Sequence, residues 1–337
     1  RSSGAASTGI DASTTTSVSQ EPAKAATPPY AAAMDEGNCG IDLERTRQSI
    51  PAPRDDLPSR PILDRIRESV IGDDHVMHGP FGPRRVTYAD YTASGRALDL
   101  VEDTLREQVL PWYANTHSET SFTGAQTTAL REEARATIRR ALGGSEDDKI
   151  IFCGAGATAA INRLIDILGL RLPRDLDRRY DLSARIPEAE RPVVFVGPYE
   201  HHSNELPWRE SIADVVPIPL ADDGAIDREA LAEALARYGD RPLRIGSFSA
   251  ASNVTGIRSD VPGITRQLKA AGALAFWDYA AAGPYVRIDL NAPGAPIDAV
   301  FLSPHKFVGG PGTPGVLAVK RQLLANSVPA VVGGGTV

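Results

Sequence analysis

The stretch Phe301–Gly312, "FLSPHKFVGGPG", joins a short apolar run to a glycine-rich turn through a histidine and a lysine. The apolar run is "AVFLS" (299–303), and a second run, "GVLAV" (315–319), follows the turn. Short apolar runs bounded by glycine and proline are typical of buried strands. We therefore expect two strands here, with the primary amine of Lys306 placed where the first of them ends.

Four apolar runs of the same kind come earlier in the chain: "IIF" (150–152), "PVVFVG" (192–197), "LRIGSFS" (243–249) and "ALAFWD" (273–278). Most runs are separated by segments with helical composition, among them 101–110, 127–142, 227–238 and 261–271, of which the last three end at glycine. This alternation predicts an α/β protein with three α/β/α layers around a mostly parallel sheet.

Composition narrows the classes of partner. The 337 residues are 42% hydrophobic and carry a net charge of −7, so we expect no nucleic-acid partner, because phosphate backbones need a basic surface. No uninterrupted apolar stretch reaches the length of a membrane span. The two cysteines lie far apart without metal-ligand spacing, which favours a reducing compartment without a structural disulfide. A small-molecule partner fits these features best.

The ends of the chain differ from its middle. Residues 1–60 are rich in Ser, Thr, Ala and Pro, so we expect a disordered lead, followed by a folded domain over 61–320. Asp11 and Glu21 in the lead argue against a transit peptide, so we assign the cytoplasm by default and keep organellar targeting as an alternative. We interpret 321–337 as the start of a truncated C-terminal domain, and the chain as a fragment.

In such sheets, ligands bind beyond the carboxyl ends of the strands. After 150–152 comes "CGAGAT" (153–158), where glycines and a helix start with Thr158 form a potential phosphate site. A plain glycine turn explains this motif better when it is taken alone. The motif lacks the lysine of a P-loop, which disfavours ATP and GTP.

Polar residues also follow the next strands. Adjacent His201 and His202 point in different directions, so a two-histidine metal site is disfavoured, and one imidazole could lie against a planar ligand. A solvent-exposed polar loop is an equally good reading of this segment. Asn253 follows the run 243–249, and Asp278 ends a run too apolar to hydrate a carboxylate well. A buried carboxylate needs hydrogen-bond donors or a cation.

Lys306 follows Asp278 by 28 residues, about one strand–helix–strand step, so both can reach one pocket. A lysine that forms a Schiff base, an aspartate facing a pyridinium nitrogen and a phosphate site at a helix start together describe a site for pyridoxal 5′-phosphate (PLP). Lysines at strand ends more often only cover apolar surface. The flanking His305 and the glycines that follow favour the cofactor site here.

Seven segments together resemble the class V aminotransferase group of fold type I PLP enzymes, and within it cysteine desulfurases and selenocysteine lyases. They are "YADYTASGRAL", "NTHSETSFTG", "IIFCGAGATAAINRL", "PYEHHSNELPW", "SAASNVTGI", "FWDYAAAGP" and "FLSPHKFVGGPGTPGVL". The resemblance runs from about Tyr88 to Val337, in the family's order.

The resemblance implies roles for individual residues. Lys306 would form the Schiff base, Asp278 would pair with the pyridine nitrogen, and His201 would stack on the ring. The remaining cofactor-binding positions would be Ala157, Thr158, Asn253, Ser303 and His305. The family also implies a homodimer, in which Thr336 would reach the phosphate of a neighbouring subunit. We expect no metal site.

Two departures from the family pattern stand out. Where the family commonly has Asp-Gly-Ala-Gln, this chain has Tyr279 after the aspartate and Ala281 in place of the glutamine. Neither Cys39 nor Cys153 matches the sulfur-accepting cysteine of desulfurases, which lies with the substrate-binding arginine in the family's C-terminal domain. We expect Cys153 to pack as a small apolar residue.

Three functions stay open at this point. The first is a PLP enzyme of the desulfurase or lyase type that acts on an amino acid. The second is an aminotransferase or epimerase on the same scaffold. The third is an inactive binding module, against which the joint presence of Lys306, Asp278 and His201 argues.

Overall fold

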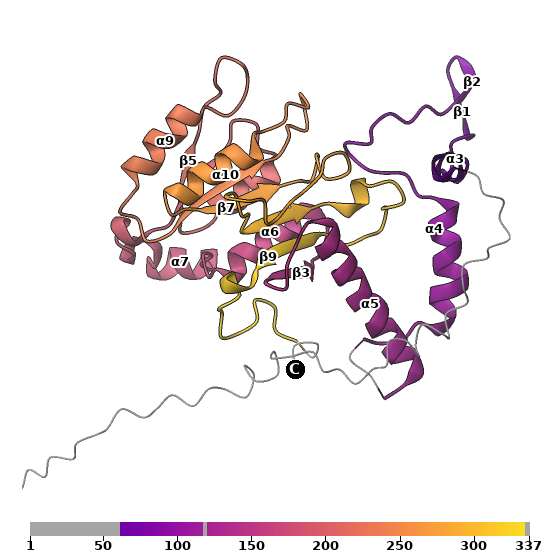
Figure 1. The fold of residues 1–337 in the computed structure, drawn as a ribbon, viewed down its shortest axis with the longest axis horizontal. Coiled ribbons are helices and arrows are strands. Elements are labelled where there is room, and N and C mark those ends of the chain that lie inside the picture. The colour runs from indigo at the N-terminus through magenta and orange to yellow at the C-terminus, as the bar shows by residue number, and fades with distance from the viewer. Residues whose placement is uncertain (1–60, 117–119, 334–337) are drawn as a thin grey trace, which may run out of the picture. The chain divides into compact units, whose positions relative to one another are not determined.

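A computed structural model describes residues 61–116 and 120–333, which all lie in one unit of the chain, Leu43–Val337. Within these residues the core is a seven-stranded sheet in the order β3-β9-β8-β7-β6-β4-β5 (Figure 1). The strands are β3 (Asp148–Phe152), β4 (Val193–Val196), β5 (Asp214–Pro217), β6 (Arg244–Ser249), β7 (Leu274–Asp278), β8 (Ala299–Leu302) and β9 (Val316–Lys320).

The direction of the strands confirms the mostly parallel sheet. Strands β5, β4, β6, β7 and β8 pair in parallel, whereas β9 is antiparallel to both of its neighbours, β8 and β3. Strand β9 is therefore the reversed one of the seven. The reversal follows from its connection, because the link from β8 holds a 3-10 turn, Pro304–Lys306, and glycines in place of a crossover helix.

All six strands expected from the apolar runs are present, and the sequence prediction missed three others. Strand β5 lies at the edge of the sheet and ends in Pro217, a residue that weakens a strand pattern and is tolerated at edges. Strands β1 (Val76–Gly79) and β2 (Gly82–Arg85) form a separate, largely exposed hairpin. Exposed strands lack the apolar signal that burial imposes.

Helices cover both faces of the sheet, which confirms the three layers. On one face lie α6 (Gly156–Ile167) and α8 (Leu206–Arg209), which share one core cluster, and on the other α9 (Arg228–Arg237) and α10 (Val261–Ala270), which share another. Figure 1 shows α6, α9 and α10. Alternate residues of a strand face opposite sides. Accordingly, Phe276 belongs to the core cluster of α6 and the next residue, Trp277, to that of α9 and α10.

Local sequence explains the helix ends. Asp227 caps α9 by accepting hydrogen bonds from the amides of Glu229 and Ala230, and Asp260 caps α10. The other described α-helices are α3 (Ile62–Glu68), α4 (Asp99–Thr104), α5 (Phe122–Ala141) and α7 (Arg174–Tyr180).

Two helices differ from the sequence prediction. Helix α5 begins at Phe122, five residues before the expected start at 127, because the Ser121 side chain caps it by accepting from the amide of Gly124 at 3.1 Å. The helix expected over 101–110 is α-helical through Thr104 and continues as a π-helical turn, Leu105–Val109.

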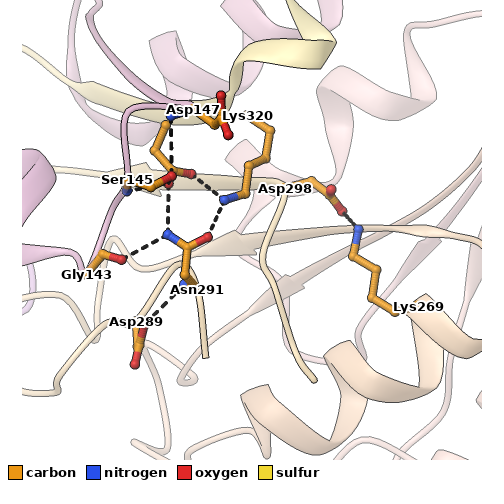
Figure 2. A network of polar contacts seen from close by, with 9 residues as sticks. Gly143, Ser145, Asp147, Lys269, Asp289, Asn291, Asp298 and Lys320 are labelled. Atoms are coloured by element: carbon orange, nitrogen blue, oxygen red, sulfur yellow. Dashed lines mark hydrogen bonds and ion pairs between the residues drawn. The ribbon is translucent and has the colours of Figure 1, made fainter. Parts of the chain in front are cut away.

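Buried ion pairs lie at the edge of the sheet where the parallel strands begin (Figure 2). Asp148, the first residue of β3, is 1% exposed, and its Oδ1 lies 2.8 Å from Lys320 Nζ at the end of β9. Its Oδ2 accepts from the Ser145 amide and from Asn291 Nδ2. Asp298, just before β8, contacts Lys269 of α10 and accepts from the Ala275 amide at 2.7 Å. These carboxylates tie neighbouring strands together.

Several expectations about the chain's organisation stay predictions. Residues 1–60, with Cys39, and Thr336 lie outside the described residues. The domain limits 61–320 and 321–337 are not tested by this structure. Among the described residues, no helix is long and apolar enough to cross a membrane.

Candidate active site

A cavity of about 620 Å³ lies at the carboxyl ends of the parallel strands. Every residue predicted for the cofactor site lines it: Ala157, Thr158, His201, Asn253, Asp278, Ser303, His305 and Lys306. They come from the segments that follow β3, β4, β6, β7 and β8. The topology thus brings together residues that lie up to about 150 positions apart in the sequence.

Lys306 closes the 3-10 turn that follows β8 and is partly buried. Its ammonium group makes no hydrogen bond or ion pair with any described residue. Burial lowers the pKa of Lys306, and the carboxylates of Asp278 and Asp90 only partly oppose this effect. The amine is therefore easier to deprotonate than an ordinary lysine, as a nucleophile or base requires.

Asp278 is the last residue of β7 and is 4% exposed. Its Oδ1 accepts a hydrogen bond from the Ala280 amide at 2.8 Å, and no described cation lies within ion-pair distance. Burial raises the pKa of Asp278 to about 6, although the Ala280 amide and the charge of Lys306 act in the opposite direction. A cationic group in the cavity would therefore stabilise the carboxylate.

The start of α6 forms one wall of the cavity. Gly156 has a φ of 58°, and a Cβ there would lie 3.0 Å from both Ser303 Oγ and His305 Cε1. The Ala157 amide donates to Ser303 Oγ at 2.8 Å, and Thr158 Oγ1 donates to Ser203 Oγ at 2.7 Å. Hydroxyl groups and the positive end of a 12-residue helix therefore meet at one place, an arrangement suited to an anion.

His201 begins the loop after β4, and its ring lines the cavity. Its Nδ1 accepts from the Ser203 amide at 3.1 Å and lies 3.0 Å from Ser203 Oγ. Burial and the charges of Lys306 and His202 lower the pKa of His201, so the ring is neutral at pH 7. Because Nδ1 is an acceptor, the proton lies on Nε2.

Sequence reasoning missed several groups of the site. Asp90 and Thr92 line the cavity from a segment that precedes the predicted sheet. This segment packs against the lysine turn, since the Gly95 amide donates to the His305 carbonyl at 2.8 Å and a Cβ on Gly95 would fall 1.9 Å from the Phe307 carbonyl oxygen. It carries no apolar run, so no strand-end argument could have found it.

The structure also describes two residues that depart from the family pattern, Ala281 and Cys153. Ala281 lines the cavity, as a residue at that position of the motif should. Cys153 is buried, with 7% of its surface exposed, and burial raises the pKa of its thiol. This is expected for a cysteine that packs as an apolar residue. Among the described residues, no group of three His, Cys, Asp or Glu side chains could hold a metal ion.

Curated proteins are similar to this chain in sequence. "Probable cysteine desulfurase" of Staphylococcus aureus (strain Mu50 / ATCC 700699) is 28% identical over 269 residues, 79% of this chain and 60% of the relative. A protein of the same description from Staphylococcus epidermidis (strain ATCC 12228 / FDA PCI 1200) is 29% identical over 273 residues, with the same coverage. The chain thus spans about 60% of the length of these curated relatives.

The fold has solved counterparts. The apo structure of cysteine desulfurase from Thermococcus onnurineus NA1 superimposes with a TM-score of 0.62 at 20% identity, covering 83% of this chain and 62% of that chain. At this identity the likeness establishes the fold. Residues 87–337 match the family described as "Aminotransferase class-V". On that match, which takes in every lining residue of the cavity, the chain belongs to the aminotransferase class-V family.

Proposed function

We propose that this chain is the cofactor-binding part of a PLP-dependent enzyme that acts on an amino acid. One observation carries the proposal: the amine of Lys306 and the carboxylate of Asp278, neither in an ion pair with a described residue, line the same cavity as the start of α6. These three groups match the aldehyde, the ring nitrogen and the phosphate of PLP. The residues present therefore fit the cofactor.

When bound, the cofactor would supply an electron-withdrawing ring that stabilises negative charge on the α-carbon of an amino acid. Asp278 would hold a proton on the ring nitrogen, and His201 would lie against the ring with Asn253 near its edge. Ala157, Thr158, Ser303 and His305 would bind the phosphate with the helix start.

Lys306 has two proposed tasks. Its amine is the group to which the cofactor's aldehyde would attach. Lys306 Nζ would also be the base for the proton of the substrate's α-carbon, because burial lowers the pKa of this amine. Asp90 and His305 line the same cavity as Lys306.

For the reaction itself we favour a cysteine desulfurase or selenocysteine lyase type, and the description of the curated relatives, "Probable cysteine desulfurase", supports the first of these. An aminotransferase or epimerase is the second candidate, favoured by the missing glutamine at Ala281, which leaves the ring's surroundings different from the family pattern. For either reaction we propose a homodimer. A third candidate is an inactive binding module, which would be supported if the protein formed no Schiff base with pyridoxal phosphate.

The test uses the full-length protein with added pyridoxal phosphate. We expect visible absorbance, and borohydride reduction followed by peptide mapping should place the label on Lys306 and on no peptide of Lys306→Ala. Lys149→Ala, on β3 and away from the cavity, is the control and should label like the wild type. A wild type that stays colourless would refute the cofactor proposal.

The products then separate the reactions. Release of alanine together with sulfide or selenide from cysteine or selenocysteine supports the lyase type. A keto acid or an inverted amino acid supports the second candidate and contradicts the first.

A further inference from the structure

Glu200, the residue before His201, carries a buried carboxyl group. Glu200 Oε1 accepts from the Ser249 amide at 2.8 Å, and Oε2 accepts from Ser249 Oγ at 2.7 Å and from Asn204 Nδ2 at 2.6 Å. No lysine, arginine or histidine of the described residues forms an ion pair with Glu200. Three neutral donors therefore hold this carboxyl group in place.

These bonds connect the parts of the site. Ser249 ends β6 and is the register partner of Asp278 on β7, so Glu200 joins the histidine loop to the strand beside Asp278. The bond from Asn204 closes the segment 200–204 around His201, in parallel with the backbone bond from the Asn204 amide to the His201 carbonyl at 2.7 Å. The position of His201 thus depends on the Glu200 side chain.

Glu200 also lies within the electric field of Asp278. Burial raises the pKa of Glu200 to about 7, the bonds from Ser249 and Asn204 oppose this, and the charge of Asp278 raises it further. The titratable groups that face the pair are Tyr199 beside Glu200, and Lys306, which faces Asp278. Two close carboxyl groups disfavour each other's ionisation.

We propose that Glu200 is a positioning residue of this site, which holds the His201 loop against β6 and whose ionisation is coupled to the charge of Asp278. The inference rests on the proposed function of His201 and Asp278. Glu200 does not line the cavity, so it would touch neither substrate nor cofactor.

The first test needs no cofactor. The folded protein binds an extra proton at Glu200 between the ordinary pKa of 4.5 and about 7, so the stability that Glu200 contributes is present at low pH and lost as the pH rises through this window. The melting temperature of Glu200→Gln minus that of the wild type should therefore increase from pH 5 to 7 and then level off. Glu210→Gln, an exposed isosteric control paired with Arg174, should show a flat difference. A flat difference for Glu200→Gln would contradict a buried carboxyl group with a raised pKa, and the proposal with it.

A second measurement follows Asp278. The charge of Asp278 raises the pKa of Glu200, so in an Asp278→Asn background the difference in melting temperature that Glu200→Gln causes should level off at a lower pH. Ser249→Ala keeps the charge but removes a donor, which raises the pKa of Glu200 and shifts its stability window to higher pH. Unchanged profiles in both variants would refute the proposal. A wild type that binds no cofactor but shows the stability window would refute the proposed function alone.

Discussion

Buried aspartates and partly buried lysines lie at both ends of the strands of the central sheet, but they are paired at one end and unpaired at the other. Where the parallel strands begin, Asp148 is in contact with Lys320 and Asp298 with Lys269 (Figure 2). Where they end, Asp278 lines a cavity that also contains Lys306, and no ion pair joins the two.

The pKa of the paired aspartate is lowered, whereas the pKa of the unpaired one is raised. Burial alone would raise the pKa of Asp148, but hydrogen bonds from Lys320, Asn291 and Ser145 outweigh it and lower the pKa. For Asp278, burial prevails and the pKa rises to about 6. The buried carboxylates at the starts of the parallel strands are thus paired with lysines and stabilise the fold. Asp278, at the end of its strand, has no such partner in the described residues, and a ligand in the cavity can supply one.

The largest effect should come from removing the lysine of the cavity. Lys306→Ala should lower turnover by about 10³-fold or more, because it removes both the cofactor attachment and the base. The same change should leave the free energy of unfolding nearly unchanged, since Lys306 pairs with no described carboxylate. Turnover and urea unfolding of the same preparation measure both quantities. A strongly destabilised variant would show that the lysine has a structural role after all.

The lysine of the opposite edge should behave in the reverse way. Lys320→Met leaves Asp148 buried without its cation, which should cost about 3–5 kcal/mol of unfolding free energy. Bound pyridoxal phosphate per folded protein should stay at the wild-type level. Chemical denaturation and cofactor absorbance check the two parts, and a loss of cofactor without a loss of stability would contradict the division between the edges.

The two buried aspartates should respond to pH with opposite signs. Asp278 has a raised pKa, so its contribution to stability falls as the pH rises from about 4 to about 6, and the stability of Asp278→Asn relative to the wild type should increase by about 3 kcal/mol across that window. Asp148 has a lowered pKa, so its contribution is present at neutral pH and lost in acid, and Asp148→Asn should be destabilised at pH 7. Unfolding free energies measured between about pH 2 and pH 7 test this, because the window of Asp148 lies below the ordinary pKa of an aspartate and that of Asp278 above it; equal signs would contradict the comparison.

The smallest effect concerns a hydroxyl that connects two walls of the cavity. Ser203→Ala removes the acceptor of Thr158 Oγ1 and the partner of His201 Nδ1, so we expect a loss of about 1 kcal/mol in pyridoxal phosphate binding, or about fivefold in Kd. Titration of the cofactor measures it. Ser211→Ala removes a comparable bond, to the Trp208 carbonyl, away from the cavity and should not change the affinity.

Much of this architecture follows from local patterns. The runs that form β3, β4, β6, β7, β8 and β9 are apolar because each strand is covered on both faces, and that burial is visible in the sequence. Lys306 and Asp278 could be placed in one pocket because they end strands of a sheet whose carboxyl ends share an edge. The sequence prediction missed the hairpin β1–β2 because it is largely exposed, and β5 because it is short, half-buried and ends in proline at the edge of the sheet.

The sequence by itself determined the succession of strands and helices and the residue types available at each strand end, since spacing and glycine punctuation act over a few residues. Only the tertiary structure decided which lysine and aspartate pair and which stay apart. It also decided that Glu200 bonds to Ser249 and that Asp90 reaches the cavity. The reason is physical: ion pairs and hydrogen bonds require distances of about 3 Å, and those depend on the register of strands that are distant in the chain.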